Sequence, residues 1–176
     1  MTKWLPVVLL CSILPAQANA AAEPDLAALE QQAVQITQQF GGQLKNLLQA
    51  SMASGGPVQA MQVCKTSAPQ IAQTVSQDSG WQVARTSSKV RNPANRPDTW
   101  EQQVLAEWTR QIAQGTPVAQ LKHSAVVNEN GKQTYRYLQA IPTAELCVNC
   151  HGSALAPEGN AALAELYPQD QATGFK

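Results

Sequence analysis

One short break divides the longest regular stretch of this sequence. Apolar side chains recur at the spacing of one helix face over residues 24–53 and again over residues 58–75. The break between them, Ser54-Gly55-Gly56-Pro57, is made of residues that a helix interior disfavours. Two long helices are therefore predicted. Their inward faces are expected to carry Leu26, Leu29, Ala33, Ile36, Phe40, Leu44, Leu47 and Met52 in the first, and Val58, Met61, Cys64, Ala68, Ile71 and Val75 in the second.

Pro69 lies inside the second predicted helix. Proline donates no N–H, and its ring clashes with the carbonyl group four residues earlier, here that of Lys65. A kink is therefore expected close to Cys64.

The first 20 residues form a separate unit. Lys3 is their only charge, an apolar run covers most of residues 5–14, and Ala18-Asn19-Ala20 has the small-x-small pattern of a cleavage site. These features predict a secretory signal peptide over residues 1–20. A membrane-spanning helix is not expected here, because the apolar run is shorter than the about 20 residues that one needs. We expect a periplasmic protein with a single domain over residues 21–176 and no membrane span after cleavage.

Charge and cysteine number limit the function further. Twelve basic and twelve acidic residues give a formal charge of +0, and loss of the signal peptide with its one Lys leaves −1. Such a chain lacks the positive charge that nucleic-acid binding requires, so no nucleic-acid partner is expected. Of four cysteines, Cys11 lies in the signal peptide, which leaves Cys64, Cys147 and Cys150. An odd number in an exported protein leaves one thiol to be explained.

The remainder of the chain is predicted to mix helices and strands, which gives an α+β fold. A short strand is expected over residues 81–86, followed by a basic, turn-rich loop over residues 85–97. Asp98 and Glu101 have the spacing of a capping box at a helix start. That helix is expected to end at Gly115 and to bury Trp100, Val104, Trp108 and Ile112.

Two more strands are expected over residues 121–127 and 132–141. Asn130-Gly131 lies between them, and Asn-Gly is a strong signal for a hairpin turn. A loop with a short helix over residues 160–166 is expected to follow. Tyr135 and Tyr137 alternate on the second strand, where either ordinary sheet packing or a pocket wall would explain them.

Cys147-x-x-Cys150-His151 is the pattern of c-type haem attachment. The two thiols can each add to one haem vinyl group, and the adjacent imidazole can then reach the iron. Two other interpretations compete with a single covalent haem c. One is a redox dithiol of the thioredoxin type, and the other is a zinc site formed by these three residues and Cys64. Haem is favoured over zinc because the side chains of the neighbouring residues Cys150 and His151 diverge, so one zinc ion would rarely bind both.

A second axial ligand, opposite His151, has four candidates. They are His123, Cys64, Met52 and Met61. A lone His on a strand and a Met at helical spacing are more often packing residues. Cys64 is equally explained as a ligand and as a small buried apolar residue.

Four spaced segments resemble a known family. They are AMQVCKTSAPQIA at 60–72, RTSSKVRNPANRPDTWE at 85–101, YRYLQAIPTAELCVNCHG at 135–152 and YPQDQATGFK at 167–176. The chain is identified as similar to the single-haem, c-type periplasmic domains with a PAS-like fold, long catalogued as a domain of unknown function. The resemblance implies a PAS-like antiparallel sheet with long N-terminal helices. It also implies a further Gly-rich strand, which this sequence, ending at Lys176, does not contain.

The same resemblance implies a His/Cys-ligated iron, which here would be held by His151 and Cys64. It favours Arg85 and Arg91 as partners of the haem propionates, whereas Lys89 and Arg96 are expected to be solvated. Three functions then compete. A redox or gas sensor is preferred, with a redox partner protein or a small gas as its ligand. A single-electron carrier is the alternative, and an enzyme such as a peroxidase is not expected, because a Cys64 ligand would block the iron.

Overall fold

The structure is a computed structural model that describes residues 24–175. The predicted signal peptide, residues 1–20, lies outside the described residues. Within residues 24–175, no helix is both long and apolar enough to cross a membrane.

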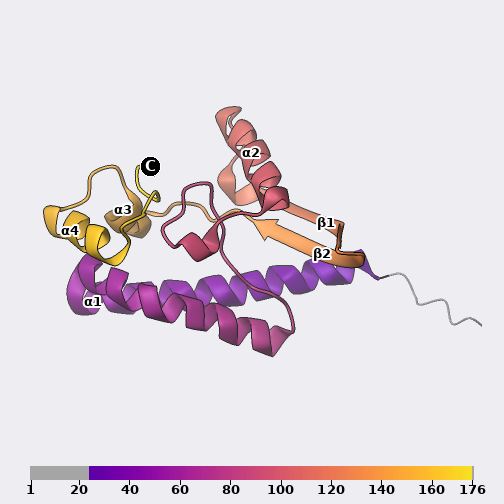
Figure 1. The fold of residues 1–176 in the computed structure, drawn as a ribbon, viewed down its shortest axis with the longest axis horizontal. Coiled ribbons are helices and arrows are strands. Elements are labelled where there is room, and N and C mark those ends of the chain that lie inside the picture. The colour runs from indigo at the N-terminus through magenta and orange to yellow at the C-terminus, as the bar shows by residue number, and fades with distance from the viewer. Residues whose placement is uncertain (1–23, 176) are drawn as a thin grey trace, which may run out of the picture.

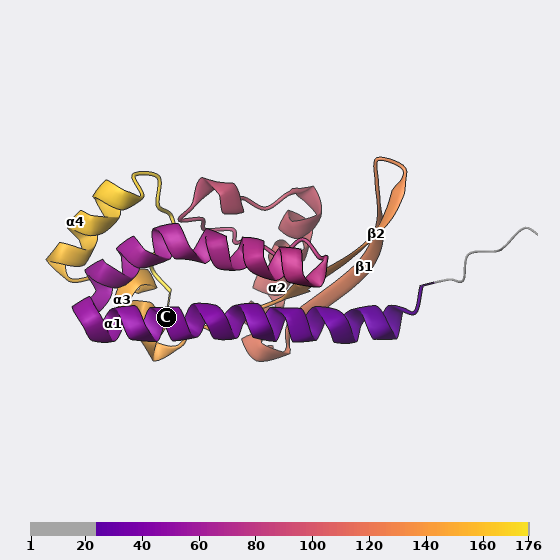
Figure 2. The same ribbon diagram turned by 90° about the horizontal axis from the view of Figure 1, so that it is seen from below.

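Helix α1, Leu26–Ser79, is folded back on itself at the predicted break. Gly55 and Gly56 have non-helical backbone angles, and Gly56, with φ 66° and ψ −162°, is in a region that essentially only glycine adopts. Two antiparallel helical arms result, and they lie side by side in Figures 1 and 2. The predicted helix pair is thus confirmed. The backbone stays helical through Pro69, where a kink was expected.

The ends of α1 have identifiable caps. The Asp25 carboxylate accepts hydrogen bonds from the backbone N–H groups of Ala27 and Ala28, at 3.0 and 3.2 Å. Gly80, with φ 73°, ends the helix in the left-handed conformation that favours glycine. The buried residues of the two arms are Ala33, Phe40, Ser51, Ala60, Met61, Ala68 and Val75.

No strand forms over residues 81–86, so that prediction is wrong. The segment is held instead by the second arm of α1, where Ser76 Oγ accepts a hydrogen bond from the Val83 N–H at 2.9 Å. Trp81 packs its ring edge-to-face on Tyr135, with ring centroids 5.9 Å apart. The hydroxyl of Ser76, on a helix, thus accepts the hydrogen bond that a neighbouring strand would otherwise accept from Val83. A short 3-10 turn, η1 (Pro93–Asn95), follows in the loop.

Helix α2, Thr99–Ala113, begins with the predicted capping box. Val104 and Trp108 are buried with Leu121 in one apolar cluster, and Trp100 packs at its edge. Ile112 was expected to be buried, but 45% of it is exposed. It lies in the last turn of α2, beyond the part of the helix that contacts the cluster. A 3-10 turn, η2 (Val118–Gln120), leads into the sheet.

The sheet is one antiparallel hairpin of β1, Lys122–Glu129, and β2, Lys132–Gln139. Asn130 and Gly131 have φ of 54° and 84°, which is the primed turn that Asn-Gly predicts. Val126 pairs with Tyr135, and Ala125 with Arg136. Of the PAS-like sheet that the resemblance implies, the described residues form these two strands.

Two short helices complete the chain, α3, Glu145–His151, and α4, Pro157–Leu166. The second was expected over 160–166 and begins earlier, with Pro157 in its first turn. Met61, Cys150, Ala162 and Leu163 form an apolar cluster where α3 and α4 meet α1. In Figure 1, α3 and α4 lie at the end of the molecule where α1 folds back on itself, and α2 and the hairpin lie toward the opposite end.

Candidate functional site

Helix α3 carries the Cys-x-x-Cys-His pattern. Cys147, Cys150 and His151 are three and four positions apart, a spacing that places side chains on one face of a helix. Cys150 is buried and Cys147 half-buried, and both are free thiols, as is Cys64. Gly152 ends the helix at a position where a Cβ atom would lie 2.5 Å from the Val148 carbonyl oxygen. Only glycine therefore fits directly after the histidine.

The imidazole of His151 has a fixed orientation. Its Nδ1 atom lies 2.7 Å from the carbonyl oxygen of Ala172. A carbonyl can only accept, so Nδ1 carries the proton and Nε2 keeps its lone pair. Phe175 contacts the ring edge-to-face, with ring centroids 6.0 Å apart. Burial, followed by the positive charge of Arg91, lowers the pKa of His151 below its ordinary value. A neutral imidazole with one free nitrogen is the form that binds a metal.

The C-terminal segment, residues 167–175, contacts His151 and Gly152 through its backbone. The Phe175 N–H donates to the His151 carbonyl at 2.9 Å, and the Gly174 N–H donates to the Gly152 carbonyl at 3.1 Å. These bonds form a short bridge between residues 152 and 175. The segment thereby delivers the Ala172 carbonyl to the imidazole.

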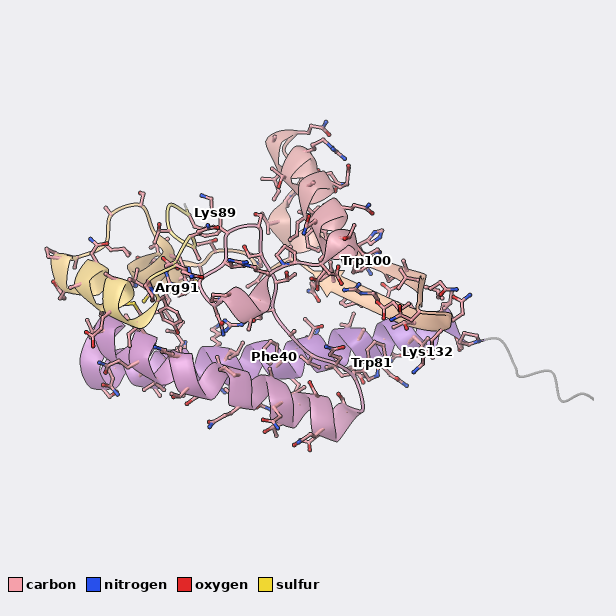
Figure 3. The ribbon with its side chains drawn as sticks, in the orientation of Figure 1. Phe40, Trp81, Lys89, Arg91, Trp100 and Lys132 are labelled. Carbon is pink, nitrogen blue, oxygen red and sulfur yellow. The ribbon has the colours of Figure 1, made fainter. Side chains whose placement is uncertain are left out.

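Arg91 joins three separate segments. Its Nε donates to the Asp170 carboxylate at 2.8 Å. Its Nη2 donates to the carbonyl oxygens of Cys150, at 2.6 Å, and Ala172, at 3.2 Å. The side chains of Arg91 and Asp170 are only 12% and 11% exposed, so the ion pair is largely shielded from water. In Figure 3 Arg91 lies at the end of the molecule that holds α3 and α4, whereas Trp100 lies beside the hairpin.

Cys64 lies on the second arm of α1 and belongs to the same group of side chains. Burial raises its pKa, and the guanidinium groups of Arg85 and Arg91 act in the opposite direction. Burial also raises the pKa of Cys150, which Arg91 opposes, while Cys64 and Cys147 add to the rise. Met61, three positions before Cys64 on the same arm of α1, packs with Cys150 in one apolar cluster. The fold therefore brings this arm of α1, from one half of the chain, to the α3 cysteines, from the other.

The other basic residues of the loop over residues 85–97 differ in their surroundings. Arg85 is exposed. Lys89 is exposed, but its Nζ lies 3.4 Å from the Thr173 carbonyl oxygen and 5.5 Å from the centre of the Phe175 ring. Arg96 is exposed next to η1, as expected of a solvated residue.

The other candidate ligands pack elsewhere. His123 packs against Trp100 with the two rings tilted by 41° and their centroids 5.6 Å apart, on the side of α2 and the hairpin. Met61 is buried, and its methyl group lies 3.9 Å from where a Cβ on Gly159 of α4 would be. Met52 is half-buried beside the break in α1. His123 and Met61 therefore serve as packing residues.

Within residues 24–175, no group of three or more His, Cys, Asp or Glu side chains is placed to hold a metal ion. The four-ligand zinc site considered from the sequence is thus not assembled. Iron in a porphyrin makes a smaller demand, because the macrocycle supplies four nitrogens and the protein supplies only the axial ligands. The donor set fits that demand, since His151 offers Nε2 and Cys64 a sulfur atom.

Sequence reasoning missed Ala172, Asp170 and Phe175. Their only signal was the YPQDQATGFK segment of the family resemblance. A backbone carbonyl has no sequence signature, and the Arg91–Asp170 pair spans 79 positions.

Comparison with known proteins gives two matches. The family model described as Tll0287-like matches residues 15–176. A solved structure, described as the cyanobacterial heme-protein Tll0287, has a similar fold, with a TM-score of 0.58. The two chains are 23% identical over 89% of each. The comparison with curated proteins found no similar sequence.

Proposed function

The chain belongs to the Tll0287-like family, and from this and the geometry of α3 we propose that it is a periplasmic protein with one covalent haem c. Cys147 and Cys150 would form the thioether links, and His151 and Cys64 would be the two protein ligands of the iron. The fold neighbour is itself described as a heme-protein, which supports this assignment. A PAS-like relationship is part of the proposal.

The observation that carries the proposal is the hydrogen bond between His151 Nδ1 and the Ala172 carbonyl. Iron-binding histidines generally donate their other ring N–H to a carbonyl or carboxylate, which fixes the tautomer and the ring orientation. A buried packing histidine also needs a partner for its ring N–H. The two free cysteines on the same helix face are what favour a haem-binding histidine here.

The bound haem would supply a one-electron Fe(III)/Fe(II) couple. Cys64 would bind as a thiolate, because iron and the nearby guanidiniums of Arg85 and Arg91 favour the charged form that burial disfavours. A thiolate favours Fe(III), so the reduction potential would be low compared with His/Met ligation. Arg85, which is exposed, would remain available to pair with a propionate, whereas Arg91 already uses Nε and Nη2 within the protein.

Sensing of redox state or of a small gas is the function that we propose for this centre. Reduction by a partner protein of the electron-donor class, or protonation of the sulfur, would weaken the hold of Cys64 on the haem. The haem would then supply a binding position for carbon monoxide or nitric oxide. We infer that the protein is not an enzyme, since Cys64 as a second iron ligand would leave no open position for a substrate. A single-electron carrier is the alternative, in which Cys64 stays bound in both states.

The test is a spectrum of the full chain exported together with haem-maturation machinery. Covalent haem, which survives acid–acetone extraction, and a ferric spectrum that changes in Cys64→Ala but not in His123→Ala are expected. Absence of covalent haem from the wild-type protein would overturn the proposal. A Cys64→Ala spectrum identical to that of wild type would mean that Cys64 does not bind the iron and is a packing residue.

The ferrous protein separates the two functions. A sensor is expected to bind carbon monoxide after reduction, with the spectrum of a newly opened iron. An electron carrier would keep six ligands and show no response to the gas.

A further inference from the structure

Four groups form a continuous polar chain behind the candidate iron ligand. Asp170 accepts from Arg91 Nε at 2.8 Å, Arg91 Nη2 donates to the Ala172 carbonyl at 3.2 Å, and that carbonyl accepts from His151 Nδ1 at 2.7 Å. Asp170 also accepts from the Ala172 N–H, at 3.2 Å. Arg91 and Asp170 thus hold the amide N–H and the carbonyl of one residue.

The Ala172 carbonyl has two lone pairs, and both are in use. One receives the imidazole N–H, and the other receives an N–H of a guanidinium, which is always charged and is the stronger donor. An acceptor shared with a cation has less electron density to offer its second donor. The hydrogen bond from His151 is therefore weaker than one to a carbonyl that serves His151 alone.

We propose that Arg91 is a positioning residue that tunes how strongly His151 donates to the haem iron, acting through the carbonyl oxygen of Ala172. This inference rests on the proposed haem function. It is separate from the propionate role that the family resemblance favoured for Arg91, because the atoms involved point to Asp170, Cys150 and Ala172.

The direction of the effect follows from the geometry. With Arg91 in place, the imidazole keeps more of its Nδ1 proton and is the weaker electron donor, which supports Fe(II). Without the Arg91 hydrogen bond, the carbonyl accepts more strongly, the imidazole becomes more anionic in character, and Fe(III) is favoured. The reduction potential should therefore fall when this one hydrogen bond is lost.

Arg91→Lys tests this directly, because it keeps the positive charge and removes the fork that joins Asp170 to Ala172. In the haem-loaded full chain, we expect about a tenfold shift toward Fe(III), the lower end of effects seen for groups behind metal ligands. For one electron this is a fall of about 59 mV. Lys89→Gln is the matched control, since Lys89 also approaches a carbonyl of the same segment, that of Thr173, but not Ala172.

A potential in Arg91→Lys equal to that of wild type would overturn the inference, because the hydrogen bond to Ala172 would then have no effect on the iron. It would leave the haem assignment intact, because that assignment rests on covalent haem in the wild-type protein. If Arg91→Lys does not retain haem, NMR of the wild-type holoprotein decides. Slow solvent exchange of the Arg91 guanidinium protons is expected, and exchange as fast as that of the exposed Arg96 would contradict the proposed contact.

Discussion

Ala172 and His151 are 21 positions apart in the chain, yet the carbonyl oxygen of one lies 2.7 Å from Nδ1 of the other. This contact fixes the tautomer of the one histidine in the Cys-x-x-Cys-His pattern. It exists because the C-terminal segment folds back along α3 and pairs with residues 151 and 152. The site therefore depends on the last ten residues of the sequence as much as on the cysteines.

The end of α3 should tolerate only glycine. In Gly152→Ala the new Cβ would meet the backbone oxygen of Val148 at 2.5 Å, and backbone atoms cannot yield without unwinding the helix. We expect a loss of about 1–3 kcal/mol of stability and a lower yield of covalent haem, measured by thermal unfolding and by haem absorbance per protein. Gly159→Ala is the control, since its Cβ would meet its neighbours at an ordinary 3.9 Å. Equal behaviour of the two variants would contradict this explanation.

The fold-back of α1 should depend on Gly56. Its φ of 66° and ψ of −162° suit glycine alone, so Gly56→Ala is expected to cost about 1–3 kcal/mol. Gly41→Ala should have the opposite sign and stabilise by about 0.5–1 kcal/mol, because Gly41 lies mid-helix with no heavy atom near its missing Cβ. Denaturant unfolding measures both. A neutral Gly56→Ala would mean that the turn has another stable conformation.

Acid should weaken the junction between α2 and the hairpin. Asp98 is partly desolvated, which raises its pKa, but hydrogen bonds from the Glu101 backbone and Arg136 outweigh this, so the pKa is lowered. A lowered pKa means that Asp98 stabilises the fold above its ordinary pKa of 3.8 and that this contribution is lost as the pH falls through the folded-state value.

Asp98→Asn keeps a good N-cap and removes the charge. The difference in unfolding free energy between this variant and wild type should be present at pH 7 and vanish in strong acid. A difference that does not change with pH would mean that the effect is not electrostatic.

Two apolar residues of α2, Trp108 and Ile112, should differ sharply in how much stability the protein loses when each is replaced by alanine. Trp108 is 8% exposed and packs with Val104 and Leu121, whereas Ile112 is 45% exposed. Trp108→Ala is expected to cost about 3–5 kcal/mol, and Ile112→Ala about 0.5 kcal/mol or less. Chemical denaturation of both variants checks this, and a large cost at Ile112 would indicate that a partner covers it.

Features that depend on neighbouring residues could be predicted from the amino-acid sequence alone. The two helical stretches, the glycine break, the Asp98–Glu101 capping box and the Asn-Gly hairpin all formed as expected, because side-chain periodicity, capping and turn angles act over a few positions. The Cys-x-x-Cys-His spacing and the odd cysteine likewise pointed to the residues of the site. The family resemblance added the pairing of Cys64 with His151, which stays a prediction.

Features that depend on contacts between distant segments could be seen only in the folded protein. The strand expected over residues 81–86 did not form, because β2 pairs with β1 and meets this segment through the ring contact of Trp81 with Tyr135. Ile112 is exposed because α2 extends past its cluster. The propionate role that the family resemblance favours for Arg91 stays a prediction, whereas its contacts with Asp170, Cys150 and Ala172 came from the fold. These outcomes follow from contacts between segments up to 81 positions apart, and local sequence patterns carry no information about which distant donor will meet which carbonyl.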